Sequence, residues 1–297
     1  MNSESACYPD TCLATKVSLK IRLEKFLKVF KPDMVVSSRR GSDGRPVNQD
    51  AVMLTGGKIP RIGVADGISK SNKGQIASKL AFLPFLLSPP ACTKGLAELA
   101  VTGHALVTEI YRMFDEAKVG GTTLVVAEVR RGAMATVLNI GDSRAYLLTP
   151  CGLFRRHYKC RQITVDQIYG ELKKRIRLDN PDQYPDHVMY QSIGSGLITS
   201  EVVPKRVTIP AGGMLLLATD GLFKVMNDDC REIAEVVESL SNPDAKTIAD
   251  ALITRALELK SSDDISVAVI LPSYLLGARW PFWSGICAAV CAGGLLS

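Results

Sequence analysis

Histidines and closely spaced cysteines, the residues from which zinc sites are built, are scarce in this sequence. Its 297 residues include three histidines and eight cysteines, and no two cysteines form a C-x-x-C pair. Structural zinc sites are commonly built from such pairs, and disulfide-stapled scaffolds are short, cysteine-dense chains. The sequence therefore predicts neither, and it indicates reduced thiols, as in the cytosol.

The sequence also has few aromatic residues and no strong excess of charge. Aromatic side chains make up 6%, and 36 basic against 30 acidic residues give a net charge of +6. Residues 1–32 hold six basic and three acidic side chains, which accounts for half of that excess. Because the rest is nearly balanced and lacks a basic-aromatic stripe, we expect no nucleic acid as a partner.

The basic N-terminal arm, residues 1–32, lacks the apolar core of a secretory signal, so we expect a cytoplasmic protein. Apolar positions within 16–30 fit both the period of a strand and that of a helix. Two interpretations of the arm stay open. It is either an amphipathic helix on a membrane or on the domain, or a helix with a solvated face.

The C-terminus is set apart by its lack of charge, since residues 280–297 carry none. At a rise of about 1.5 Å per residue, these residues would span roughly 27 Å as a helix, close to the hydrocarbon thickness of a bilayer. Arg279 beside Trp280 and Trp283 resembles a cytoplasmic positive flank with an aromatic belt. The segment is either an anchor on the inner face of a membrane or a docked C-terminal helix.

Glycine-rich nucleotide-binding loops are absent, because neither G-x-x-x-x-G-K-[ST] nor G-x-G-x-x-G occurs. The body of the chain instead contains short apolar segments punctuated by glycine and aspartate. We expect strands at 34–36, 51–54, 61–65, 122–129, 133–140, 145–148, 214–218 and 265–271, and helices at 75–86, 94–117, 168–176, 229–240 and 244–259. Short links between neighbouring strands predict antiparallel pairing, including that of 133–140 with 145–148. Helices grouped between strand runs favour an α+β class.

Five aspartates stand at the ends of the expected core strands. They are Asp50 before 51–54, Asp66 after 61–65, Asp142 after 133–140, Asp220 after 214–218 and Asp263 before 265–271. Carboxylates that converge repel one another unless cations lie between them. Oxygen-rich, histidine-poor ligand sets suit Mg²⁺ or Mn²⁺ better than Zn²⁺. The alternative is that Asp66-Gly67 and Asp220-Gly221 only mark turns at strand ends.

Six short motifs that contain these residues follow one another along the chain. They are Asn48-Gln49-Asp50, Val64-Ala65-Asp66-Gly67, Gly121-Thr122-Thr123-Leu124, Ile140-Gly141-Asp142-Ser143-Arg144-Ala145, Ala218-Thr219-Asp220-Gly221-Leu222 and Asp263-Asp264-Ile265-Ser266-Val267. Together they resemble the metal-dependent protein phosphatases, the phosphatase 2C-like or PPM family, and in particular its bacterial branch. The resemblance implies a central β-sandwich of two antiparallel sheets flanked by helices, with a dinuclear Mn²⁺ or Mg²⁺ site at one edge. It places a phosphatase domain at 33–273, between the basic arm and a hydrophobic tail at 274–297.

The resemblance also implies which residues hold the metals. Asp66 resembles the carboxylate that bridges both ions, and Gly67 the glycine that offers its backbone carbonyl. Asp220 and Asp263 resemble the further ligands of one ion. In some relatives, a residue at the position of Asp142 helps that of Asp220 to hold a third, weaker ion.

Two more residues complete the implied catalytic machinery. Asp50 resembles the acid that holds metal-bound waters, and it joins Asp66, Asp220 and Asp263 as a candidate catalytic residue. Arg45, five residues before Asp50, occupies the position of the family's phosphate-binding arginine. A guanidinium there can bind two phosphate oxygens at once, which a lysine would do less well.

The activity that follows from the resemblance is a protein serine/threonine phosphatase. Two cations lower the pKa of a bridging water, which attacks phosphorus in line without a covalent phosphoenzyme. The implied substrates are phosphorylated proteins, and the implied counterpart is a Ser/Thr kinase.

Two positions depart from the eukaryotic pattern of the family. Ile68 stands where those relatives carry a histidine suspected of general-acid work, and Gln167 replaces a second histidine in Thr164-Val-Asp166-Gln167. The chain's own three histidines, His104, His157 and His187, match no motif. An alternative function is a pseudophosphatase, folded alike but acting as a membrane-tethered module that binds phosphoproteins. The complete acidic set and Arg45 argue against it.

Overall fold

A computed structural model describes residues 32–272, apart from Asp43, Arg45, Lys58, Arg131 and the segments 69–72, 89–94, 114–119, 152–156, 195–197, 199–201 and 228–229. The predicted hydrophobic tail and the basic arm up to residue 31 lie outside the described residues. Residues Asp33–Pro272 form one compact unit. Within the part of the chain that is described, no helix is long and apolar enough to cross a membrane.

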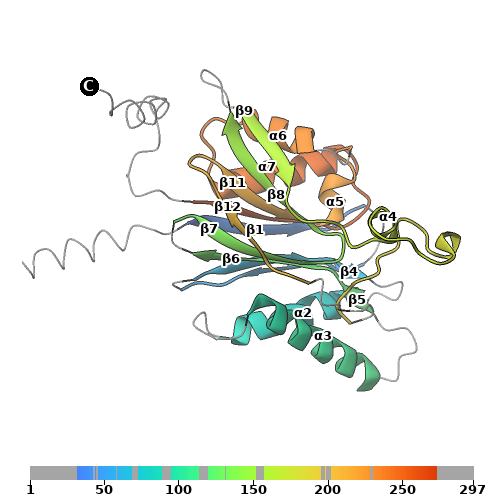
Figure 1. Cartoon of the computed structure of the whole chain (residues 1–297). Helices are drawn as coiled ribbons and strands as arrows, with labels where there is room; N and C mark the ends of the chain where they lie inside the picture. Colours follow the sequence, from blue (N-terminus) through green and yellow to red (C-terminus); the bar gives the residue numbers. More distant parts are fainter. Residues whose placement is uncertain are drawn as a thin grey trace, which may run out of the picture. The chain divides into compact units, whose positions relative to one another are not determined.

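Two five-stranded antiparallel sheets form the centre of this unit (Figure 1). The first has the order β1 (Asp33–Arg39), β12 (Ile265–Leu271), β11 (Met214–Ala218), β8 (Arg144–Cys151), β9 (His157–Gln162). The second has the order β10 (Lys205–Thr208), β7 (Met134–Ile140), β6 (Leu124–Arg130), β3 (Arg61–Ala65), β2 (Ala51–Leu54). A two-stranded ladder joins β4 (Gly67–Ile68) to β5 (Gly121–Thr122). The predicted α+β sandwich of two antiparallel sheets is confirmed.

Helices cover the outer faces of both sheets (Figure 1). Helices α2 (Gly74–Leu87) and α3 (Leu96–Met113) pack on the sheet of β2, β3, β6 and β7, whereas α5 (Asp220–Phe223), α6 (Cys230–Glu238) and α7 (Ala245–Glu258) pack on the other sheet. The short α4 (Tyr169–Lys173) and a 3-10 turn (Pro181–Gln183) lie between β9 and β10 in the chain. The central strands are buried on both faces, so nearly all of their residues are apolar. Met214–Ala218, in which every residue is buried, is an example.

Local signals explain where the helices begin and which face they bury. The carboxylate of Asp244 accepts a hydrogen bond of 2.8 Å from the backbone N–H of Thr247, which caps the first turn of α7. Ile248, Leu252 and Ala256 then recur at helical spacing, and all three are buried against the sheet.

Most predicted elements appear near their predicted positions, but one predicted pairing is wrong. The expected ladder between 133–140 and 145–148 does not form, because β7 and β8 belong to different sheets. Gly141 has a φ of 96°, in the left-handed region, and the chain crosses there from one sheet to the other. The short link between β7 and β8 therefore connects the two sheets and does not form a hairpin within one of them.

A buried arginine ties the second sheet to the end of α2. Arg61 is 2% exposed, and its Nε lies 3.3 Å from Oε2 of Glu128. Its Nη1 donates to the backbone carbonyls of Phe85 and Ser88 at 3.0 and 2.9 Å. Arg130, which is 54% exposed, binds the other oxygen of Glu128 at 2.7 Å. Arg61 therefore satisfies carbonyls at the end of α2 that have no further helical turn to bind them.

We expect Glu128→Gln to destabilise the fold by about 3 kcal/mol, because it leaves the buried Arg61 charge without its carboxylate. Arg130→Ala removes only the exposed partner and should cost no more than about 1 kcal/mol. Urea unfolding followed by circular dichroism measures both. Equal losses in the two variants would contradict a special role for the buried pair.

Candidate metal centre

The five predicted aspartates gather at one end of the sandwich, although they come from five separate stretches of chain. Each lies within two residues of the beginning or end of β2, β3, β7, β11 or β12; Figure 1 labels α5 and β4 at this end of the sandwich. The carboxyl of Asp66 is close enough to four others for their charges to act on it; these are Asp50, Asp220, Asp263 and Asp142. The structure therefore brings together all five carboxylates that the sequence singled out.

Burial and mutual repulsion make ionisation unfavourable in this cluster. Burial, followed by the charges of the neighbouring aspartates, raises the pKa of Asp66 well above its usual range. The pKa of Asp50 rises to about 8, mainly through burial and further through Asp264 and Asp220. The pKa of Asp142 rises to about 6, again through burial first and then through Asp220. The cluster carries more acidic groups than it can hold ionised without cations.

Asp50 is fixed by residues that follow β11 and that lie at the start of β12. Thr219 donates to Oδ2 of Asp50 at 2.9 Å, and the backbone N–H of Ser266 donates to the hydroxyl of Thr219 at 2.9 Å. The buried Asp264 accepts hydrogen bonds from the backbone N–H groups of Gln49 at 2.7 Å and Gly41 at 3.2 Å. Asp264 thus ties the start of β12 to the loop that carries Asp50. We did not predict this role from the sequence, although the Asp263-Asp264 pair was its visible signal.

Asp66 is fixed by the two threonines of the Gly121-Thr122-Thr123 motif. The hydroxyl of Thr122 donates to the backbone carbonyl of Asp66 at 2.8 Å. The backbone N–H of Asp66 donates to the hydroxyl of Thr123 at 2.9 Å, and this hydroxyl lies 2.7 Å from that of Ser143. Ser143 follows Asp142, so one chain of hydrogen bonds links two of the five acids.

The two Asp-Gly pairs mark close approaches of backbone rather than turns. Gly67 lies in β4 and Gly221 in α5, and neither has a positive φ. A Cβ on Gly67 would lie 2.3 Å from the backbone carbon of Gly74, and one on Gly221 would lie 2.1 Å from the carbonyl oxygen of Asp264. Glycine is required because other backbone packs against these positions. The turn interpretation of these pairs is therefore wrong.

Residues 164–167 clamp the turn that carries Asp142. Gln167 accepts from the backbone N–H of Gly141 at 2.7 Å through its side chain, and its own N–H donates to the Gly141 carbonyl at 3.0 Å. Thr164 accepts from the N–H of Ala145 at 3.0 Å. Gln167, which stands in place of a family histidine, is thus an anchor of this turn.

A second part of this clamp reaches the helix that begins at Asp220. Arg144 is buried, and its guanidinium binds Asp166 through Nε at 3.0 Å and Nη2 at 2.6 Å. The same guanidinium lies 3.9 Å from the ring centroid of Phe223 in α5. One buried cation therefore holds together the segments that carry Asp142 and Asp220.

The chemistry of the cluster fits divalent cations. Oδ1 of Asp50 and Oδ1 of Asp220 are buried without a hydrogen-bond partner, which is costly for a carboxylate oxygen unless a cation binds it. The other oxygen of Asp220 contacts the ammonium of Lys224. Within the described residues, no three carboxylate, imidazole or thiol side chains already surround a common point.

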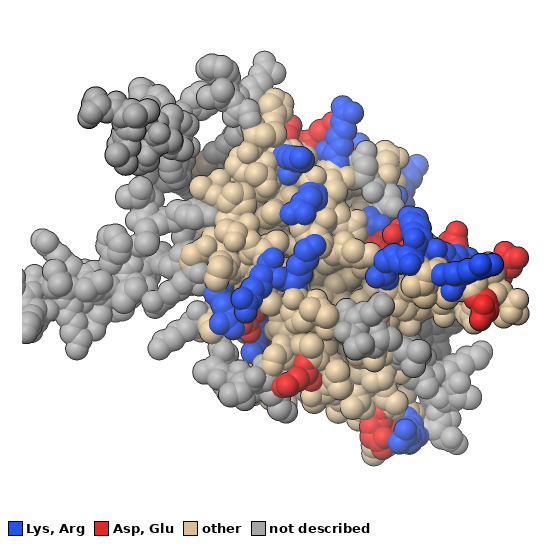
Figure 2. Space-filling model, viewed as in Figure 1, with Lys and Arg blue, Asp and Glu red and all other residues tan. Residues whose placement is uncertain are grey.

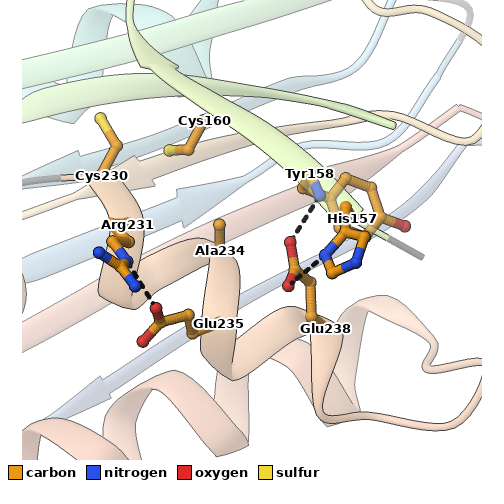
Figure 3. A pocket seen from close by; sticks show the side chains of 8 residues that line it. All are labelled: His157, Tyr158, Cys160, Cys230, Arg231, Ala234, Glu235 and Glu238. Atoms are coloured by element: carbon orange, nitrogen blue, oxygen red, sulfur yellow. Dashed lines mark hydrogen bonds and ion pairs between the residues drawn. The ribbon is translucent and has the colours of Figure 1, made fainter. Parts of the chain in front are cut away.

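One predicted site residue, Arg45, and two histidines that match no motif remain to be placed. Arg45 lies outside the described residues, so its role stays a prediction. Nδ1 of His104 accepts from the backbone N–H of Gly194 at 3.1 Å, and burial lowers its pKa. His157 contacts Glu238 at 3.1 Å in a pocket of about 450 Å³ between β9 and α6, also lined by Cys160 and Cys230 (Figure 3). None of the predicted site residues lines this pocket.

Known proteins of similar sequence are phosphatases. No family model matches the chain. "Probable protein phosphatase 2C 41" of Oryza sativa subsp. japonica is 31% identical over 159 residues, 51% of this chain and 55% of that protein. "Serine/threonine phosphatase stp" of Listeria monocytogenes is 24% identical over 229 residues, 71% of this chain and 84% of that protein. The chain thus spans about half the length of the plant proteins it matches.

A solved structure has the same fold. The catalytic domain of the serine/threonine protein phosphatase PstP, in complex with two manganese ions, has a TM-score of 0.65 and 24% sequence identity, covering 82% of this chain and all of that one. With the ordered motifs and the matching sandwich, the chain is similar in sequence to phosphatase 2C-type and bacterial serine/threonine phosphatases and shares the fold of the PstP catalytic domain.

Proposed function

We propose that this protein is a metal-dependent protein serine/threonine phosphatase that uses two Mn²⁺ or Mg²⁺ ions. The observation that supports this most strongly is the set of five neighbouring carboxylates, two of which have a buried oxygen without a partner. The phosphatase relatives and the two manganese ions bound by PstP point the same way.

The proposed division of labour follows from where each side chain is held. Asp66, Asp220 and Asp263 would bind the two ions with the backbone carbonyl of Gly67. The Asp142 carboxylate would add a third, weaker site beside Asp220. When bound, divalent cations lower the pKa of water and stabilise the charge that develops in an in-line displacement at phosphorus.

The remaining groups would bind and orient the reactants. Thr219 donates to Oδ2 of Asp50, whereas the buried Oδ1 of Asp50 has no hydrogen-bond partner and would orient a water. Arg45 would bind two phosphate oxygens of the substrate. Ile68 and Gln167 offer no imidazole to protonate the leaving serine or threonine oxygen, so water would supply that proton.

We expect the metal-loaded protein to hydrolyse p-nitrophenyl phosphate and a phosphoserine peptide. Asp66→Ala and Asp220→Ala should each lower kcat/KM by more than about a hundredfold, because removing residues that only support a metal ligand already costs 10–100-fold. Arg45→Ala should raise KM more than it lowers kcat. The control is Asp182→Ala, which removes an exposed carboxylate of the 3-10 turn. A wild-type protein that binds phosphopeptide but releases no phosphate would contradict the phosphatase and support the pseudophosphatase.

Metal binding should also appear in stability, without any turnover. At 100 times its Kd, Mn²⁺ stabilises the folded state by about 2.7 kcal/mol, or roughly 5–10 °C in Tm for a domain of this size. Without metal, Asp66→Asn should melt at or above the wild-type temperature, because it replaces a buried acid whose ionisation is unfavourable with a neutral side chain of similar size. With metal, the order should reverse. A Mn²⁺ shift that is equal in both proteins would contradict a role for Asp66 as a ligand.

We further propose that the C-terminal tail brings the domain to the inner face of a membrane in the cytoplasm, where a cognate Ser/Thr kinase would phosphorylate the shared substrates. Asp33 and Leu271 are register partners at one end of β1 and β12. Arg39 pairs with Ile265 at the other end, beside the carboxylates and about 20 Å away at 3.4 Å per residue. Asp33 and Leu271, close to the ends of the described unit, thus lie at the end opposite the proposed catalytic centre.

Removing the residues after Arg279 should move the protein from the membrane to the soluble fraction of cell lysates. The hydrolysis of p-nitrophenyl phosphate should stay within twofold of wild type, because the carboxylates lie at the other end of the sandwich. Fractionation of both forms tests this. A wild-type protein that is already soluble would contradict the anchor.

A further inference from the structure

Basic side chains gather where the open edges of the two sheets meet. β9 ends one sheet and β10 ends the other. Nζ of Lys205 in β10 donates to the backbone carbonyl of Ile163, the residue after β9, at 3.0 Å. Ile163 and Val207 also share one hydrophobic cluster between the sheets. The two edge strands therefore lie side by side, although more than forty residues separate them in the sequence.

The pleat of the strands directs three basic side chains toward this edge. In β9, Tyr158 and Cys160 pack against the α6 side, so Lys159 and Arg161 project from the opposite face, toward the second sheet. In β10, Lys205 shares a face with Val207, which belongs to the core between the sheets. Lys159, Arg161 and Lys205 are all exposed, and we call them the basic edge.

No carboxylate neutralises the basic edge within the described residues. None of its three side chains takes part in an ion pair, whereas lysines and arginines on the helices, such as Lys246, Arg231 and Arg255, each contact an acid. Neither β9 nor β10 contains an acidic residue. Figure 2 shows Lys and Arg side chains along this side of the molecule with few acidic ones between them. Three like charges close together favour an anionic partner.

The basic edge lies beside the carboxylate centre at a distance that a peptide can bridge. Lys205 pairs with Val137, three residues before the end of β7, and Asp142 follows two residues after that end. Arg161 pairs with Leu147, five residues beyond Asp142. At about 3.3 Å per residue, Val137 and Leu147, the register partners of Lys205 and Arg161, lie up to roughly 16 Å along the chain from Asp142, or about five residues of extended peptide.

We propose that the basic edge binds acidic residues about five positions from the phosphoserine or phosphothreonine of a protein substrate. This proposal rests on the phosphatase function and adds a substrate class to it. A protein segment fits better than a membrane, because the edge flanks the catalytic centre and a substrate that enters this centre must pass close to it. The positive edge would also offset the repulsion that the acidic centre exerts on an acidic substrate.

The test compares two phosphoserine peptides of otherwise identical sequence. One carries three consecutive glutamates that start five residues from the phosphoserine, and the other carries three glutamines at the same positions. For the full chain loaded with Mn²⁺, KM should be lower for the acidic peptide by on the order of tenfold, and 0.5 M NaCl should remove the difference. Lys159→Glu/Arg161→Glu and, separately, Lys205→Glu should remove the preference. Hydrolysis of p-nitrophenyl phosphate, which is too small to reach the edge, should stay within twofold of wild type.

Arg206→Glu is the matched control. Arg206 is exposed and adjacent to Lys205, but it points to the opposite face of β10. It should keep the preference for the acidic peptide within twofold. If Arg206→Glu and Lys205→Glu lost the preference for the acidic peptide to the same extent, the preference would depend only on the net charge of the protein, and the proposal would be overturned.

Two further measurements separate the proposal from its rivals. Fluorescence anisotropy of the labelled peptides measures binding without turnover, so equal affinities for both peptides would overturn the basic edge even if phosphatase activity is present. Loss of activity toward p-nitrophenyl phosphate in the wild type would instead contradict the proposed function. If Lys159→Glu/Arg161→Glu abolished binding to phosphatidylserine vesicles but left the peptide preference intact, the edge would be a membrane surface, and the proposal would fail.

Discussion

The repulsion among buried carboxylates at one end of the sandwich is the constraint on which the rest of the structure depends. Asp50, Asp66 and Asp142 have raised pKa values because burial and neighbouring acids disfavour their charges. A fold that holds such a cluster must fix each carboxylate through its neighbours, since the acids themselves push apart. A divalent cation bound among these carboxylates would replace their mutual repulsion with attraction. A cluster of buried acids that destabilises the fold by itself is therefore suited to bind metal.

The surrounding hydrogen bonds supply the rigidity that the cluster needs. Thr219 holds Asp50, Thr122 and Thr123 hold the backbone of Asp66, and Asp264 ties two loops to the start of β12. Arg144 links the Asp142 turn to α5 through Asp166 and Phe223. These partners come from both sheets, so the centre depends on how the two layers stack and not on any one motif. Ligands supported in this way can hold a fixed geometry once a metal binds.

The sequence predicts best what depends on local pattern and least what depends on the stacking of layers. The strands at Arg61–Ala65 and Met214–Ala218 are buried on both faces, and their apolar runs are unambiguous. The edge strands β9 and β10 expose Lys159, Arg161 and Lys205. Because these strands lack a continuous apolar run, we did not predict them from the sequence. The wrong pairing of β7 with β8 arose because a three-residue link suits a hairpin as well as a crossing between sheets. The five acids were visible as strand ends, whereas Arg144, Asp166 and Asp264 gain their roles only from tertiary contacts.

The most direct test of the central claim is a crystal structure of the full chain with Mn²⁺, with the ions located by anomalous scattering at the manganese edge. Our account predicts two manganese peaks among the carboxylates. Asp66 should contact both ions, and Asp220 and Asp263 should contact one of them. Absence of manganese from this cluster at a saturating concentration, or manganese bound only elsewhere on the protein, would contradict the account.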